Sequence, residues 1–236
     1  LAKSAATGRE ESLSLIQEAM LRLLTSLPPG KVQFTIMDPV ALGQNFAAFM
    51  HLEDEAEGIV GDRIWTDPRQ IENRLNDLCE HMETVIQKYL RNEFDTIEQY
   101  NEKAGEIAEP FRYLVIADFP TNFTDVAAQK LLSIISSGTK CGVYTLIHLD
   151  TRQPLPSNVK IEDLEAGAIV IEATDHGLTF NAPEYAELEF TPSEPPATDF
   201  MIDRLRTIGR LAKDANRVEV PFKMIAPSSD ENLWSR

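Results

Sequence analysis

Cysteine is scarce in this sequence: its 236 residues include only Cys79 and Cys141, far apart and outside any CxxC motif. So few and so widely spaced thiols argue against a disulfide framework or a cysteine-based metal site, and we expect both to be buried thiols. The four histidines are His51, His81, His148 and His176, and they form no HxxxH or HExxH pair. We expect each of them at the surface or hydrogen-bonded in the core. The sequence therefore predicts no metal site.

Long apolar runs are also absent. No stretch approaches the ~20 residues that span a bilayer, and the first residues lack the charged and apolar segments of a signal peptide. Basic residues are few as well, because 22 lysines and arginines face 38 acidic residues, for a net charge of −16. Sequence-independent nucleic-acid binding depends on basic side chains that displace counterions. We therefore expect a cytoplasmic segment that contacts neither membrane nor nucleic acid directly.

What remains is an ordinary globular composition, with 43% hydrophobic and 25% charged residues. The length suits one large α/β domain or two small ones, with enough residues for a substantial core. The chain begins with Leu rather than Met and ends without an obvious stop signal, so we expect a piece of a longer protein.

Helical and strand patterns alternate along the first two-thirds of the chain. Apolar residues at helical spacing predict a helix over residues 12–27, ended by a Pro-Pro-Gly sequence, and an alternating pattern predicts a strand over residues 32–38. Asp67 and Pro68 have the form of an N-cap followed by proline in the first turn. They open a long amphipathic helix.

Two continuous apolar runs, residues 113–117 and 141–149, indicate strands that are covered on both faces, and a helix over residues 124–138 connects them. This alternation predicts an α/β fold with a doubly wound, mostly parallel sheet and right-handed crossovers. Ligands of such sheets bind beyond the carboxyl ends of the strands. Neighbouring strands should then end side by side near Asp38, Asp118 and Asp150.

The last part of the chain changes character. Its patterns predict a hairpin at residues 168–173 and 178–180, a Pro/Glu/Ser-rich linker at 191–196, a helix at 198–214 and a short strand at 218–222. We expect the hairpin and helix to be an appendage rather than a new core. The chain is therefore divided into one domain at residues 1–190 and a linker, helix and strand at 191–236 that lead to a following domain.

Several short segments resemble the motor domain of the FtsK/SpoIIIE family of P-loop DNA translocases. They follow the family's order and comprise residues 34–39 (Phe-Thr-Ile-Met-Asp-Pro), His51-Leu52, Met82-Glu83, Tyr100-Asn101 and residues 110–119. The similarity extends from about residue 5 to residue 154. It implies a three-layer P-loop NTPase-like fold of the RecA/FtsK type. It also implies ATP and Mg²⁺ as the family's ligands and a ring, usually hexameric, as the family's assembly.

The family's P-loop, GxxxxGK[ST], would fall on the eight residues from Ala5 to Ser12, where backbone amides and the motif's lysine hold phosphates. Here Ala5 and Glu10 stand in place of both glycines, and Glu11 stands in place of the lysine. Gly8, Glu11 and Ser12 are the remnant of the nucleotide site, and only Ser12 keeps a defining residue of the motif. Because the change from lysine to glutamate reverses the charge, we expect triphosphate binding in the usual pose to be disfavoured.

The family's Walker B strand ends in Asp-Glu, where the first carboxylate supports Mg²⁺ and the second polarises water. This chain has Ala117 and Asp118 there, so the resemblance implies that the magnesium ligand is missing. Asp118 is either a remnant of the catalytic residue or a strand-end residue that caps the next loop. Arg152 either reaches a neighbour's site as an arginine finger or has no such role. The acidic run at residues 53–57 is either a solvated loop or a docking patch for a partner.

The resemblance, together with the losses at these two sites, predicts a domain without ATPase activity and without bound ATP or Mg²⁺, inside a parent protein that is a P-loop ATPase. We expect a structural or regulatory module of a multidomain translocase, whose partners are adjacent FtsK-type domains of the same chain, with a ring oligomer also open. Two alternatives remain. One is an active ATP-dependent DNA translocase subunit for chromosome segregation, which takes missing groups from its neighbours, and the other is a sensor that binds nucleotide without hydrolysis.

Overall fold

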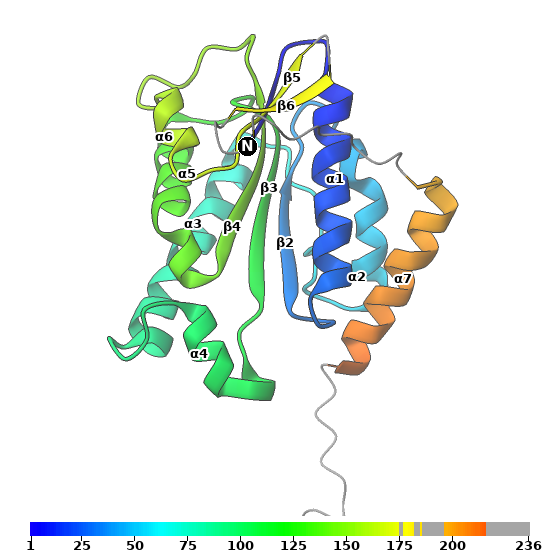
Figure 1. Ribbon diagram of the computed structural model, residues 1–236, viewed down its shortest axis with the longest axis vertical. Coiled ribbons are helices and arrows are strands. Elements are labelled where there is room, and N and C mark those ends of the chain that lie inside the picture. The colour runs from blue at the N-terminus through cyan, green and yellow to red at the C-terminus, as the bar shows by residue number, and fades with distance from the viewer. Residues whose placement is uncertain (175–176, 182–184, 186–195, 216–236) are drawn as a thin grey trace, which may run out of the picture.

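The computed structural model describes residues 1–174, 177–181, 185 and 196–215, and shows a six-stranded sheet between two layers of helices (Figure 1). The strand order is β2-β3-β4-β1-β5-β6. The strands are β1 (Ala2–Ser4), β2 (Val32–Met37), β3 (Phe111–Phe119), β4 (Val143–Asp150), β5 (Ile171–Thr174) and β6 (Gly177–Phe180). Pairing is parallel from β2 to β5, and β6 alone is antiparallel to its neighbour β5. The predicted α/β fold with a mostly parallel sheet is confirmed.

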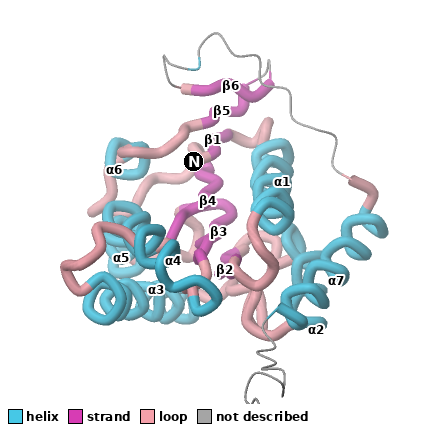
Figure 2. Tube along the Cα trace, turned by 60° about the horizontal axis from the view of Figure 1, so that its bottom comes forward, coloured by secondary structure: helices cyan, strands magenta, loops and turns pink. Residues whose placement is uncertain are grey.

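Helices cover both faces of the sheet (Figures 1 and 2). One layer contains α1 (Arg9–Ser26), the 3-10 helix η1 (Gln44–Met50), α2 (His51–Glu55) and α7 (Thr198–Ala215). The other contains α3 (Pro68–Thr84), the π-helix η2 (Val85–Leu90), α4 (Ile97–Ala104), α5 (Asp125–Ser137) and α6 (Ile161–Glu165), with short 3-10 turns η3 (Gly105–Ile107) and η4 (Gly138–Cys141). The result is the three-layer arrangement that the sequence predicts.

Local sequence signals explain where several helices begin. The Asp67 carboxylate accepts the backbone N–H groups of Arg69 and Gln70 at the start of α3, and the Thr124 hydroxyl accepts that of Ala127 at the start of α5. Each cap satisfies amides that the first helical turn leaves without partners. Helix α1 starts earlier than its apolar pattern suggests, at Arg9 rather than at residue 12, because its first turn is polar.

The core lies on both faces of the central strands. Along β3, Leu114 and Ile116 belong to the core beneath α3 and α5, whereas Val115 and Ala117 belong to the core beneath α1 and α2. All four side chains are inaccessible to solvent. Successive side chains of a strand point to opposite faces, so a strand that helices cover on both sides reads as a continuous apolar run.

The last described elements pack on the rest of the domain in two ways. Strand β5 of the predicted hairpin pairs in parallel with β1, so the hairpin extends the main sheet. Helix α7 packs across α2 and η1, with Leu205 and Ala212 buried. A side chain at Gly209 would place its Cβ 2.8 Å from the Cβ of Glu55, which shows how closely the helices approach. Residues 191–195 of the predicted linker at 191–196, and the predicted strand at 218–222, lie outside the described residues.

Gly8 provides a test of the turn between β1 and α1. Its φ is +88°, and an added Cβ would lie 2.5 Å from the Cβ of Ala173. Gly58 has a φ of +86° with nothing within 4 Å of the same position. We expect Gly58→Ala to lose about 1 kcal/mol through backbone strain alone, and Gly8→Ala to lose about 1–3 kcal/mol more through the clash. Urea denaturation of both variants measures the difference, and equal losses would contradict the close packing of the turn on β5.

Candidate functional site

Four buried polar residues gather at the carboxyl edge of the sheet. Asp38 follows β2, Asp118 lies at the end of β3, Asp150 ends β4 and Ser4 ends β1, and none of them is more than 4% exposed. Because β2, β3, β4 and β1 are neighbours in the sheet, their ends lie side by side. This is the edge at which doubly wound sheets bind their ligands, and the predicted adjacency of the three aspartates is confirmed.

Arg9 and Asp118 form a bidentate ion pair across this edge. Arg9 Nε donates to Asp118 Oδ1 at 2.7 Å, and Arg9 Nη2 donates to Oδ2 at 2.6 Å. The Asp118 side chain is 2% exposed and that of Arg9 is 24% exposed. Asp118 adopts a φ of +54°, which is uncommon for a residue other than glycine. The pair therefore joins the first residue of α1 to the end of β3 and engages both oxygens of the carboxylate.

A histidine continues the network to the end of β1. Nδ1 of His148 accepts the backbone N–H of Asp118 at 3.2 Å, and Nε2 lies 2.8 Å from the hydroxyl oxygen of Ser4. The same Nδ1 also lies 3.2 Å from Asp118 Oδ1, so its role as acceptor from the backbone or as donor to the carboxylate depends on the tautomer. A serine hydrolase needs, in addition to such a Ser-His-Asp order, a serine that a substrate can reach. All three side chains are buried, so this cluster is structural.

The charges at the edge shift the pKa values of its acids in different directions. Burial raises the pKa of Asp38, against the lowering effect of hydrogen bonds from Asn45 and Ala41. Burial also acts to raise the pKa of Asp118, but hydrogen bonds from His148 and Arg9 and the charge of Arg9 hold it below its usual value. The hydrogen bond from Arg152 holds the pKa of Asp150 well below its usual value. The bond to Asp118 raises the pKa of Arg9.

The residues of the expected phosphate loop lie at the start of α1, where they have different environments. Gly8 is the N-cap of the helix with φ +88°, and the exposed Glu11 lies in its first turn. Gly8 and Glu11 line a pocket of about 320 Å³ together with Thr7 and residues of the β5–β6 hairpin. Ser12 is fully buried, and its hydroxyl has no hydrogen-bond partner among the described residues.

Arg152 is bound within its own chain. Its guanidinium donates to both oxygens of Asp150, at 2.8 and 2.9 Å, although its side chain is 52% exposed. Gln153 donates to the same carboxylate and to Thr121. An arginine-finger role would require Arg152 to exchange this partner, and it stays a prediction. Among the described residues, no group of three or more His, Cys, Asp or Glu side chains could hold a metal ion.

The acidic run at residues 53–57 lies mostly in α2 rather than in a loop. The Glu53 carboxylate accepts the backbone N–H groups of Gly58, Val60 and Gly61 at 2.6–3.1 Å. Asp54, in contrast, is mostly exposed and pairs with His51. The run thus includes one carboxylate that holds the turn after the helix.

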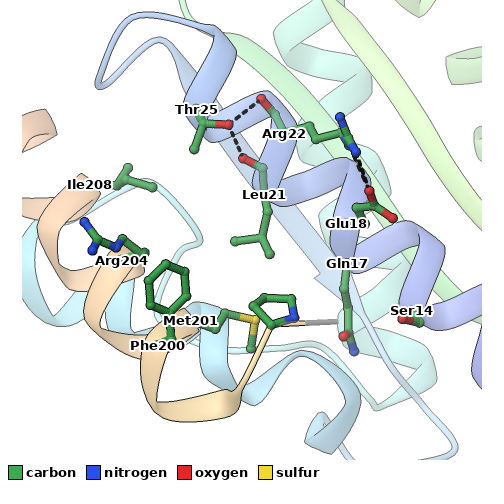
Figure 3. Close-up of a pocket in the computed structure, with 11 residues that line it drawn as sticks. Ser14, Gln17, Glu18, Leu21, Arg22, Thr25, Phe200, Met201, Arg204 and Ile208 are labelled. Atoms are coloured by element: carbon green, nitrogen blue, oxygen red, sulfur yellow. Dashed lines mark hydrogen bonds and ion pairs between the residues drawn. The ribbon is translucent and has the colours of Figure 1, made fainter. Parts of the chain in front are cut away.

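A second recess, the α1–α7 groove, lies on the outer surface between these two helices (Figure 3). Its volume is about 290 Å³. Figure 3 shows Leu21 of α1 directed toward α7, where Phe200, Met201 and Ile208 line the opposite wall. Arg204 lies 4.8 Å from the Phe200 ring centre. The groove is mainly apolar with charged side chains at its margins.

The sequence profile of the FtsK/SpoIIIE family matches residues 14–180. The chain belongs to the FtsK/SpoIIIE family. No curated protein sequence matches it significantly. No helix in the described ranges is both long enough and apolar enough to cross a membrane.

Solved structures of FtsK/SpoIIIE-type ATPases share the fold. EssC (ATPases 2 and 3) from Geobacillus thermodenitrificans aligns with a TM-score of 0.60 and 13% identity, over 93% of this chain and 45% of that one. The cytoplasmic domain of the type VII secretion ATPase EccC from Thermomonospora curvata aligns with a TM-score of 0.59 and 13% identity, over 91% and 27%. The pCW3 conjugation coupling protein TcpA aligns with a TM-score of 0.52 and 14% identity, over 73% and 48%. The family member described here thus spans less than half of each.

The Arg9–Asp118 pair predicts a specific loss of stability. We expect Arg9→Met to lower the free energy of unfolding by about 2–3 kcal/mol, because it leaves a buried carboxylate without its partner. A fully buried pair would lose ~3–5 kcal/mol, and the partial exposure of Arg9 reduces this. The double variant Arg9→Met/Asp118→Asn should recover much of the loss. Arg22→Met, which removes the exposed partner of Glu18 on the same helix, is the matched control and should change stability little.

The same pair gives a pH dependence. The folded pKa of Asp118 is depressed, so its contribution is fully present above its unfolded pKa of about 3.9 and is lost as the pH falls through the folded value. The difference between wild type and Arg9→Met should therefore be constant above about pH 5 and shrink below about pH 4. Denaturation curves between pH 3 and pH 7 measure it. A gap that stays constant down to pH 3 would show that Arg9 acts through packing rather than charge.

Proposed function

We propose that this domain does not hydrolyse ATP and serves as a structural or regulatory module of a larger FtsK/SpoIIIE-type translocase or secretion motor. The observation that carries the proposal is the bidentate Arg9–Asp118 pair. It occupies the carboxylate at the position that, in the family's motif, polarises the attacking water.

The end of β3 offers little to a magnesium ion or a water molecule. The family places a carboxylate at the position of Ala117, whose methyl group is buried in the core beneath α1. Asp118 keeps a carboxylate, but both of its oxygens already accept charged hydrogen bonds from Arg9. A general base or metal ligand needs a lone pair directed at its target. The chemistry of the donor set does not fit Mg²⁺ with ATP in the family's pose.

The start of α1 is equally unsuited to phosphate. A helix N-terminus attracts anions because its backbone N–H groups are unpaired and its dipole is positive there. Here Glu10 and Glu11 place two carboxylates in the first turn. The family's serine at this position supports magnesium, whereas the Ser12 hydroxyl is fully buried. Like charge would oppose a triphosphate entering the pocket beside Gly8 and Glu11.

A domain that keeps its core but lacks the groups for phosphate chemistry can still act through contact with neighbouring domains. The chain spans less than half of solved relatives that contain consecutive ATPase domains, such as EssC (ATPases 2 and 3). A domain of this kind can act as a spacer, a ring element or a brake on an adjacent motor. An active translocase subunit would require that Arg9 release Asp118, and a nucleotide sensor would require a triphosphate beside Glu10 and Glu11, so these two features favour the non-catalytic role.

We expect the purified domain to release phosphate from Mg-ATP at the background rate. Glu11→Lys alone should stay at background, because Ala117 still supplies no magnesium ligand and Arg9 still holds Asp118. A repaired variant restores the motif residues and removes Arg9 in one protein: Ala5→Gly, Arg9→Ser, Glu10→Gly, Glu11→Lys, Ala117→Asp and Asp118→Glu. A phosphate-release assay compares the three proteins. Turnover in the wild type, or in Glu11→Lys, would contradict the proposal.

The α1–α7 groove favours a second candidate function, the docking of a peptide. The EccC fragment with ATPases 2 and 3 was solved in complex with a signal sequence peptide, and it aligns with this chain at a TM-score of 0.57. The groove offers an apolar wall from Leu21, Phe200 and Met201 that would take the apolar side chains of such a peptide. Charged side chains at its margins would orient the peptide.

Selection of displayed peptides tests this second function. We expect peptides enriched on the wild-type domain to share an apolar anchor and to lose at least tenfold in affinity for Met201→Glu, because a carboxylate in the apolar wall would be desolvated against that anchor. The control is Ile107→Glu, at an aliphatic side chain that is 77% exposed in η3. Peptides that bind both variants alike would contradict docking in this groove.

A further inference from the structure

The loop between β2 and η1, residues 39–43, exposes two aliphatic side chains at its tip. Val40 is 51% exposed and Leu42 is 78% exposed. Leu42 also adopts a φ of +53°, in the left-handed region. Side chains with a Cβ rarely occupy this region, and glycine or asparagine normally serves there. In the isolated domain Leu42 is thus unfavourable for two reasons: its apolar side chain is exposed to water, and its backbone is strained.

The β2–η1 loop is held in place from beneath by Asp38. The Asp38 carboxylate accepts the backbone N–H of Asn45 at 3.1 Å, the Asn45 side-chain amide at 3.0 Å and the backbone N–H of Ala41 at 3.4 Å. The Asp38 carbonyl accepts the N–H of Gly43 at 3.2 Å. An added Cβ at Gly43 would lie 3.3 Å from the Cβ of Ile64, so the loop also packs closely. A buried acid is therefore used to fix the conformation that presents Val40 and Leu42.

The loop and the helix that follows it contain no charged residue. One residue in four of the chain is charged, yet none of residues 39–50 is. Helix η1 continues from the loop and buries Phe46 and Phe49 completely. The loop is thus an uncharged, apolar segment held by hydrogen bonds, on a domain whose net charge of −16 would repel other acidic surfaces.

We propose that the β2–η1 loop is a docking contact, in which Val40 and Leu42 enter an apolar pocket of an adjoining FtsK/SpoIIIE-type domain. Strained residues on rigid loops are often functional, and the strain of Leu42 is offset when its side chain leaves water. This inference rests on the proposed function, for which it names the contact surface.

An adjoining domain of the same fold is the occupant that the position favours. The loop projects from the carboxyl edge of the sheet, the edge that also holds the Arg9–Asp118 pair, and the charges of Asp38 and Asp118 act on each other there. Structural relatives that contain this fold carry a second ATPase domain in the same chain. A neighbour seated on the loop would press on Asp38 and so reach the strand ends directly.

Photo-crosslinking in the full-length parent protein tests the contact. Benzoylphenylalanine replaces Leu42 in one protein and Ile107 or Ile169, two other exposed aliphatic residues, in the controls. We expect crosslinks from position 42 to peptides of an FtsK/SpoIIIE-type domain, at a yield at least fivefold above both controls. Equal yields would overturn the proposal. So would crosslinks from position 42 that map to nucleic acid, lipid or a protein without such a domain.

Variants at position 42 separate docking from folding. Leu42→Asn and Leu42→Gly suit the left-handed conformation and remove the apolar side chain, so the unfolding midpoint should stay within about 2 °C of the wild type. With benzoylphenylalanine at position 40, each should lower the crosslink yield at least fivefold, whereas Ile107→Asn should not. An unchanged yield would overturn the proposal. Failure of the proposed function would instead appear as ATP turnover by the wild-type domain, whatever the crosslinks show.

Discussion

The ion pair between Arg9 and Asp118 organises the carboxyl edge of the sheet. It links the first residue of α1, which follows β1, to the end of β3, although β4 lies between these two strands. His148 of β4 fills the space between them and bonds Asp118 on one side and Ser4 on the other. Three neighbouring strands are therefore tied together by side chains where their backbone ladders end, and the place where α1 begins follows from that tie.

The buried acids at this edge are each satisfied within the chain, by different donors. Asp118 has an arginine from a distant segment, Asp150 has Arg152 two residues away, and Asp38 has only neutral N–H groups. The pKa values of these acids reflect their partners: the pKa values of Asp118 and Asp150, which lie beside a guanidinium, are lowered, and the pKa of the buried Asp38 is raised. Buried charge is costly unless paired. Two of the three carboxylates at this edge are therefore already paired with a guanidinium and would gain little by binding a cation.

The elements with strong local signals could be predicted from the sequence, and those defined by distant partners could not. The caps at Asp67 and Thr124 and the apolar run of β3 act over a few residues, so their patterns suffice. The Arg9–Asp118 pair joins residues 109 positions apart and depends on the strand order. In the sequence, Arg9 is merely one of three charged residues that hide the true start of α1. Nothing in the sequence indicates the left-handed conformation of Leu42, because leucine rarely adopts it.

The packing of α7 has a mechanical consequence. The helix rests on α2 and η1, with Gly209 allowing close approach to Glu55, and it is the last described element before residue 216. A load applied along the chain beyond Ala215 would thus be borne first by this helical contact. It would pass to η1, which starts directly after Gly43, and only then to the strands. Tension at this end of the domain would in this way displace the segment that follows β2, within the same helical layer.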